Sequence, residues 1–141
     1  KIFTFNGVDF YDDYAHHPTE ISSVLDGVKE VYRKKEIICV FQPHRISRVK
    51  SLKLEFSKCF KKAHTVILCP IYKANENIKL NFSYNSFAKL IIKNSKVKLI
   101  RVNNEVELKN LLKQTAYGEK LYIGMGAGSI SSWMKNLKNN I

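Results

Sequence analysis

A short stretch near the start of the chain concentrates side chains that can do chemistry. Within nine residues it holds three carboxylates, two imidazoles and a phenol, in the order Asp12-Asp13-Tyr14-Ala15-His16-His17-Pro18-Thr19-Glu20. An ionised carboxylate only accepts hydrogen bonds, so Asp13 could hold the diol of a ribose. His16 or His17 could contact a nucleotide or substrate, bind a metal, or cap a helix, and adjacent histidines seldom point at one ion. Asp12 and Glu20 are expected to be solvated or to lie at a helix start.

A second charged group follows in the sequence Phe41-Gln42-Pro43-His44-Arg45-Ile46-Ser47-Arg48. The chain has only four arginines, and two of them, Arg45 and Arg48, lie here beside His44. A guanidinium can hold a carboxylate or phosphate through two parallel hydrogen bonds. If a helix has begun by Arg45, the spacing of three places both arginines on one face, where they could bind an anion. The alternative is that both are solvated residues of a first helical turn.

A third group is the glycine-rich turn Gly124-Met125-Gly126-Ala127-Gly128-Ser129. It resembles a phosphate-binding turn, but no acidic ribose-binding residue follows about 20 positions later. Close packing of a strand against a helix explains the glycines equally well. The backbone amides of Gly126, Ala127 and Gly128 could still face an anionic substrate, because they precede a helix.

Strands that alternate with helices would position these three groups. Asn6-Gly7 predicts an opening hairpin, because both residues tolerate positive φ. The expected strands are 2–5, 8–14, 37–41, 65–69, 97–102 and 120–123, and the expected helices are 19–32, 49–63, 84–92, 105–113 and one from 130. This pattern predicts a three-layer, Rossmann-like α/β sandwich with a mostly parallel sheet and an antiparallel N-terminal hairpin strand. Ligands bind beyond the carboxyl ends of such strands, where all three groups and the connection Ile71–Asn81 would lie.

Composition narrows the function classes. The chain has 141 residues, of which 45% are hydrophobic, and no apolar run approaches the ~20 residues that cross a bilayer, so we expect one cytoplasmic domain, 1–141. Cys39, Cys59 and Cys69 have no metal-ligand spacing and are expected in the core. The net charge of +12 permits a basic nucleic-acid-binding module, but 20 of the 24 basic residues are scattered lysines. No P-loop motif occurs, so the chain alone is not a complete ATP-using enzyme.

The first two motifs, followed by Gly126-Ala127-Gly128-Ser129-Ile130, make the chain similar to the C-terminal domain of the Mur ligases, the ATP-dependent ligases of bacterial peptidoglycan synthesis. Asp13, Ala15, His16 and Pro18 match the D-x-A-H-x-P core that Mur and folylpolyglutamate ligases share. The segment from Pro43 to Arg48 resembles the branch that adds L-alanine to UDP-N-acetylmuramate. A sister branch that adds another amino acid or a peptide is the alternative.

The resemblance implies a three-domain enzyme in which this chain is a lid, inactive in isolation. The P-loop and the ligands of Mg²⁺ would lie in a central domain, so the resemblance places no metal in this chain. Asp13 and His16 would contact ATP, while Tyr14, His44, Arg45 and Arg48 would enclose L-alanine, as positioning groups without proton chemistry. The loop after Pro70 departs from the family pattern at Lys73 and Asn75, where relatives tend to have small residues.

Overall fold

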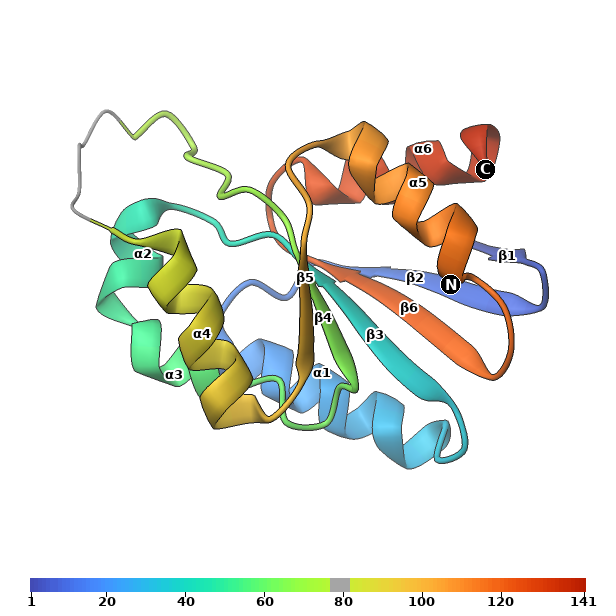
Figure 1. The fold of residues 1–141 in the computed structure, drawn as a ribbon, viewed down its shortest axis with the longest axis horizontal. Helices are drawn as coiled ribbons and strands as arrows, with labels where there is room; N and C mark the ends of the chain where they lie inside the picture. The colour runs from blue at the N-terminus through green and yellow to red at the C-terminus, as the bar shows by residue number, and fades with distance from the viewer. Residues whose placement is uncertain (77–81) are drawn as a thin grey trace.

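The computed structural model describes residues 1–76 and 82–141 and shows a three-layer α/β sandwich (Figure 1). Its six-stranded sheet has the order β1-β2-β6-β3-β4-β5. Only β1 and β2 pair antiparallel; the other neighbours are parallel. The strands are β1 (Phe3–Phe5), β2 (Val8–Asp13), β3 (Glu36–Phe41), β4 (Thr65–Leu68), β5 (Lys98–Arg101) and β6 (Lys120–Met125). The predicted fold class is confirmed.

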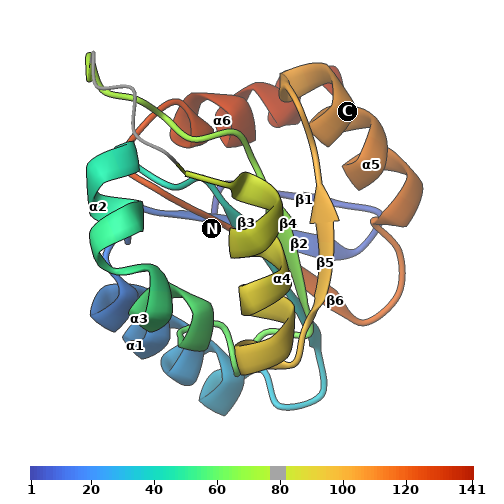
Figure 2. The ribbon, with the colours of Figure 1, turned by 60° about the vertical axis from the view of Figure 1, so that its left-hand side comes forward.

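Helices cover both faces of the sheet (Figure 2). One layer contains α1 (Pro18–Val31), α2 (Ile46–Ser51), α3 (Lys53–Lys58) and α4 (Tyr84–Ser95), and the other contains α5 (Glu105–Thr115) and α6 (Ile130–Asn140). Each layer closes its own apolar core against one face of the strands. The central strands β6, β3 and β4 are therefore buried on both sides, which explains the continuous apolar run in β3.

The opening hairpin follows the Asn6-Gly7 prediction. Asn6 and Gly7 have φ values of 52° and 76°, and Phe5 pairs with Val8 across the two-residue turn. Positive φ at both positions gives the turn the twist of the strands it joins. The hairpin places Phe10 in the sheet, where its ring stacks on that of Tyr122 at 4.9 Å.

The predicted helix 49–63 is instead two short helices, α2 and α3. The backbone leaves the helical region at Leu52, with φ −111° and ψ 24°. Leu52 is half-buried and packs against the core, as do Val49 and Phe56 on either side of it. Tertiary packing of the two segments thus outweighs the continuous helical spacing of the apolar residues.

The three cysteines are buried and free, as predicted. Burial raises the pKa of the Cys69 thiol to about 12 and that of Cys59 further still. These thiols are therefore protonated near neutral pH and pack as small apolar groups. Among the helices of the described residues, none combines the length and hydropathy needed to span a membrane.

Candidate functional site

The titratable cluster Asp12–Glu20 contains the turn between β2 and α1. The Asp13 carboxylate accepts a hydrogen bond from the amide of Ala15 at 2.8 Å. The helix begins at Pro18, one residue before the expected start at 19, and Glu20 accepts a hydrogen bond from the amide of its N-cap residue, His17, at 3.1 Å. That hydrogen bond lowers the pKa of Glu20. His17 and Glu20 therefore define the start of the helix. The residues before it lie beyond the carboxyl edge of the sheet.

Asp12 differs from its prediction as a solvated or helix-start residue. Its Oδ2 atom accepts a hydrogen bond from the Ser131 hydroxyl at 2.6 Å, which joins β2 to the first turn of α6. Its Oδ1 atom is buried and has no hydrogen-bond partner within the described part of the chain. Asp12 faces the α6 layer because side chains alternate along a strand, while its neighbour Asp13 faces the opposite side.

Four aromatic side chains form a row along the edge, which we call the ring row: Tyr14, His16, His44 and Tyr72. Successive ring centroids are 5.3, 5.9 and 5.5 Å apart, and the last pair is stacked at 17°. The Nδ1 atom of His16 lies 2.9 Å from the Tyr14 carbonyl oxygen, and since a carbonyl oxygen can only accept, this nitrogen is the donor. The row joins three loops that are distant in sequence.

His44 is held as a neutral imidazole. Its Nδ1 atom lies 3.5 Å from Nη1 of Arg48, and a guanidinium can only donate, so His44 accepts. Desolvation lowers the pKa of His44, and the charges of Arg48, His16 and Arg45 lower it further, while Glu76 opposes them. A neutral His44 orients Arg48 without adding a positive charge.

This shift predicts a pH-dependent stability. Because the folded-state pKa of His44 lies below the ordinary value of 6.5, the unfolded chain binds more protons between the two values. The free energy of unfolding should therefore fall as pH decreases below 6.5. In the His44→Gln variant it should fall less over the same range. Urea unfolding at about pH 7.0 and about pH 5.5, on either side of the usual histidine pKa, measures how the free energy of unfolding of each protein changes with pH. An equal change in the free energy of unfolding in the two proteins would contradict the role given to His44.

Arg45 precedes α2 rather than lying in it. Its φ and ψ of 68° and 126° are sparsely populated for a residue other than glycine, a conformation that costs about 1–3 kcal/mol. The helix begins at Ile46, so the condition under which helical spacing would place both arginines on one face is not met. The unusual N-cap backbone sets the direction of Arg45 instead.

The arginine pair, Arg45 and Arg48, is available to a ligand. Arg45 is exposed and Arg48 half-buried. Within residues 1–76 and 82–141, the ion pairs involve Lys1, Lys35 and His16, and neither arginine pairs with a carboxylate. Two unneutralised guanidinium groups beside a neutral imidazole favour binding of a carboxylate or phosphate.

The glycine-rich turn is closely packed against the loop after β3. The buried side chain of Gln42 donates to the Ser129 hydroxyl and accepts from the amide of Ile130, both at 2.9 Å. A Cβ on Gly126 would lie 2.9 Å from the carbonyl oxygen of Gln42, and one on Gly128 would overlap the ring of Tyr72. Close packing thus accounts for both glycines. That Gly126, Ala127 and Gly128 face a substrate stays a prediction.

The structure brings most of the predicted residues to one edge. The ring row contains Tyr14, His16 and His44, and the arginine pair adjoins it. Asp13 approaches the glycine turn, since its carbonyl oxygen accepts from the amide of Gly126 at 3.4 Å. An open hollow of about 400 Å³ adjoins Asp13 and Tyr14 and extends along the first turns of α1.

The sequence prediction missed Tyr72 and Glu76 as site residues. Both lie in the connection Ile71–Asn81, whose length and position suggested a function. Glu76 accepts hydrogen bonds from the backbone amide and hydroxyl of Ser47. Ser47 lies in the segment Pro43–Arg48, which we call the arginine segment. The last five residues of this connection, 77–81, lie outside the described residues.

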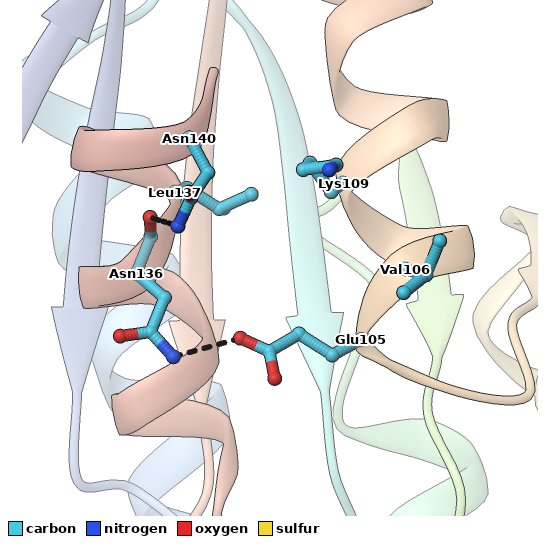
Figure 3. Close-up of a pocket in the computed structure, with 6 residues that line it drawn as sticks. All are labelled: Glu105, Val106, Lys109, Asn136, Leu137 and Asn140. Atoms are coloured by element: carbon cyan, nitrogen blue, oxygen red, sulfur yellow. Dashed lines mark hydrogen bonds between the residues drawn. The ribbon is translucent and has the colours of Figure 1, made fainter.

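A second hollow, of about 160 Å³, lies between α5 and α6 (Figure 3). Its lining residues are Glu105, Val106, Lys109, Asn136, Leu137 and Asn140. Glu105 and Asn136 are joined across it by a hydrogen bond of 2.8 Å. Its lining includes none of the ring row, the arginine pair or the glycine-rich turn, so it is separate from the candidate site.

Comparison with known proteins shows which family the chain belongs to. The family model described as "Mur ligase, glutamate ligase domain" matches residues 1–128. A UDP-N-acetylmuramate–L-alanine ligase from Pelagibacter ubique is 61% identical over 137 residues, which are 97% of this chain and 30% of that protein. The chain thus spans about 30% of the length of this relative.

Solved structures share the fold. The UDP-N-acetylmuramate-alanine ligase of Thermotoga maritima superposes with a TM-score of 0.72 at 23% identity, over 98% of this chain and 28% of that one. A single ligase domain from Haemophilus ducreyi superposes with a TM-score of 0.70 at 20% identity, over 98% of this chain and 94% of that one. Through its family match, the chain belongs to the Mur ligase family, as the C-terminal domain of these ligases.

Proposed function

We propose that the full-length protein is an ATP-dependent ligase that joins L-alanine to UDP-N-acetylmuramate, and that this chain is its C-terminal lid among three domains. The arginine pair, unpaired with any carboxylate of the described residues and set beside a neutral His44, carries the proposal, because it fits the carboxylate of an amino acid. The names of the relatives in Pelagibacter and Thermotoga support the choice of L-alanine. Since the substrates include ATP and a nucleotide sugar, we place the reaction in the cytoplasm.

In the proposed reaction, ATP phosphorylates the muramoyl carboxylate and ADP leaves. The amine of L-alanine then attacks the acyl carbon, so that a C–N bond forms, the C–O bond to phosphate breaks, and the amine gives up a proton. Arg45 and Arg48 would hold the alanine carboxylate and so direct its amine, which is a positioning effect. Tyr14 and His44 would enclose the amino acid, and Asp13 and His16 would contact the nucleotide. Closure of the lid would exclude water from the acyl phosphate.

The family resemblance implies Mg²⁺, which would neutralise phosphate charge. Among the described residues, no three His, Cys, Asp or Glu side chains are arranged to hold a metal ion. The residues at the edge therefore do not fit a metal site of their own. We place the Mg²⁺ ligands outside this chain and assign no step to the ion here.

Phosphate release by the purified full-length protein tests the proposal. Release should require ATP, UDP-N-acetylmuramate and L-alanine together. Replacing L-alanine with glycine, L-serine or D-glutamate, or replacing the nucleotide substrate with one that already carries L-alanine, tests the sister-ligase alternative. Activity with another amine and none with L-alanine would overturn the choice of substrate. The isolated chain should release no phosphate, because nothing in its sequence matches a P-loop.

A further inference from the structure

The segment Ile71–Glu76 contacts the arginine segment through its backbone. The amide of Tyr72 donates to the carbonyl oxygen of Pro43, and the amide of Arg45 donates to the carbonyl oxygen of Tyr72, each at 2.8 Å. These two hydrogen bonds lie on either side of His44 and form a parallel bridge. The second one fixes the amide of Arg45, the residue with the unusual backbone conformation.

The side chain of Tyr72 lies between two loops of the site. One face of its ring stacks on His44. The ring also occupies the space beside Gly128, where any Cβ would overlap it. Tyr72 therefore sets the distance between the glycine-rich turn and His44. His44 is the residue that accepts a hydrogen bond from Arg48.

Glu76 contacts the arginine segment one turn further along. Its carboxylate accepts from the amide of Ser47 at 3.3 Å and from the Ser47 hydroxyl at 2.5 Å. Ser47 lies in the first turn of α2, between Arg45 and Arg48, so Glu76 supplies the helix cap that Arg45 lacks. Ala74 and Asn75 have φ values of 51° and 65°, which return the chain so that Glu76 reaches Ser47.

We propose that Tyr72 and Glu76 are positioning residues for the amino-acid substrate: together they hold the segment Pro43–Arg48 so that both guanidinium groups face the substrate carboxylate. This inference rests on the proposed function. It assigns the loop a role in the affinity for the amino acid and none in nucleotide binding. Neither side chain belongs to the apolar cores, and the Tyr72 side chain is 40% exposed. Their contacts therefore order the site more than they stabilise the fold.

Steady-state kinetics of the full-length ligase tests this role. Tyr72→Ala and Glu76→Ala should each raise the KM for L-alanine about tenfold, equivalent to about 1.4 kcal/mol, while the KM values for ATP and UDP-N-acetylmuramate stay within about twofold. Tyr72→Phe keeps the ring and should remain close to the unmodified enzyme. Matched controls are Tyr117→Ala and Glu119→Ala, exposed residues between α5 and β6 at the opposite edge of the sheet. Neither control should change any KM.

A double-mutant cycle separates the capping contact from a general loss of structure. If Glu76 acts through Ser47, then Ser47→Ala combined with Glu76→Ala should raise the KM for L-alanine little more than either change alone. A common rise in all three KM values with a lowered Tm would show a merely structural role and overturn the inference. Unchanged alanine kinetics in both loop variants would also overturn it. If Arg45→Ala and Arg48→Ala leave alanine kinetics unchanged as well, the proposed function itself fails.

Discussion

Arg48→Ala in the full-length ligase is expected to raise the KM for L-alanine about 100-fold while the KM for ATP changes less than about twofold. The guanidinium of Arg48 is half-buried and oriented by His44, so its loss removes a charge-assisted contact to the substrate carboxylate. Arg45→Ala should act in the same direction but less strongly, because Arg45 is exposed and its charge is screened by water. Initial rates at varied L-alanine and saturating ATP measure the effect.

Two further variants make this result specific. Arg48→Lys keeps the charge but cannot form the two parallel hydrogen bonds, so it should recover only part of the lost affinity. Arg33→Ala removes an exposed arginine just beyond the end of α1 and should leave every KM unchanged. A rise in the KM for ATP equal to that for L-alanine in Arg48→Ala would assign the arginine to the nucleotide instead.

Gly126→Ala is expected to lower the free energy of unfolding by about 3 kcal/mol and the Tm by about 10 °C. Gly126 has φ +152°, and an added Cβ would lie 2.8 Å from Cγ2 of Ile130 and 2.9 Å from the backbone oxygen of Gln42. The backbone at Gln42 is held in place, because its amide donates to the carbonyl oxygen of Met125 at 3.0 Å and its side chain is hydrogen-bonded to Ser129 and Ile130. Urea unfolding of the chain measures the loss.

Gly27→Ala is the matched control for this substitution. Gly27 is exposed inside α1, and beyond its chain neighbours and the adjacent backbone of α1 an added Cβ would meet no atom of the described residues within 4 Å. Alanine loses less backbone entropy than glycine in a helix, so this change should stabilise the chain by about 0.5–1 kcal/mol. If both glycine variants changed stability by the same amount and sign, the packing role of the glycine-rich turn would be wrong.

The order of strands and helices could be predicted because it depends on local patterns. Asn6-Gly7 specified the hairpin turn, and the spacing of apolar residues placed α1 to within one residue at each end. The break at Leu52 could not be predicted, since nothing in the local spacing of apolar residues distinguishes one long helix from two short ones. Val49 before the break and Phe56 after it are both buried in the same apolar core.

The candidate site, like the fold, could be predicted only in part from the sequence. Residue type and spacing by themselves identified the titratable cluster at Asp13 to His16 and the arginines after His44, because dense ionisable groups beyond strand ends are unusual wherever they occur. The ring row, and the contacts of Tyr72 and Glu76 with the arginine segment, were decided only by the tertiary structure. Tyr72 lies 28 residues from His44, and only the parallel pairing of β3 with β4 brings the loops after these strands together. The sequence determines which groups can act, whereas the register of the sheet determines which of them meet.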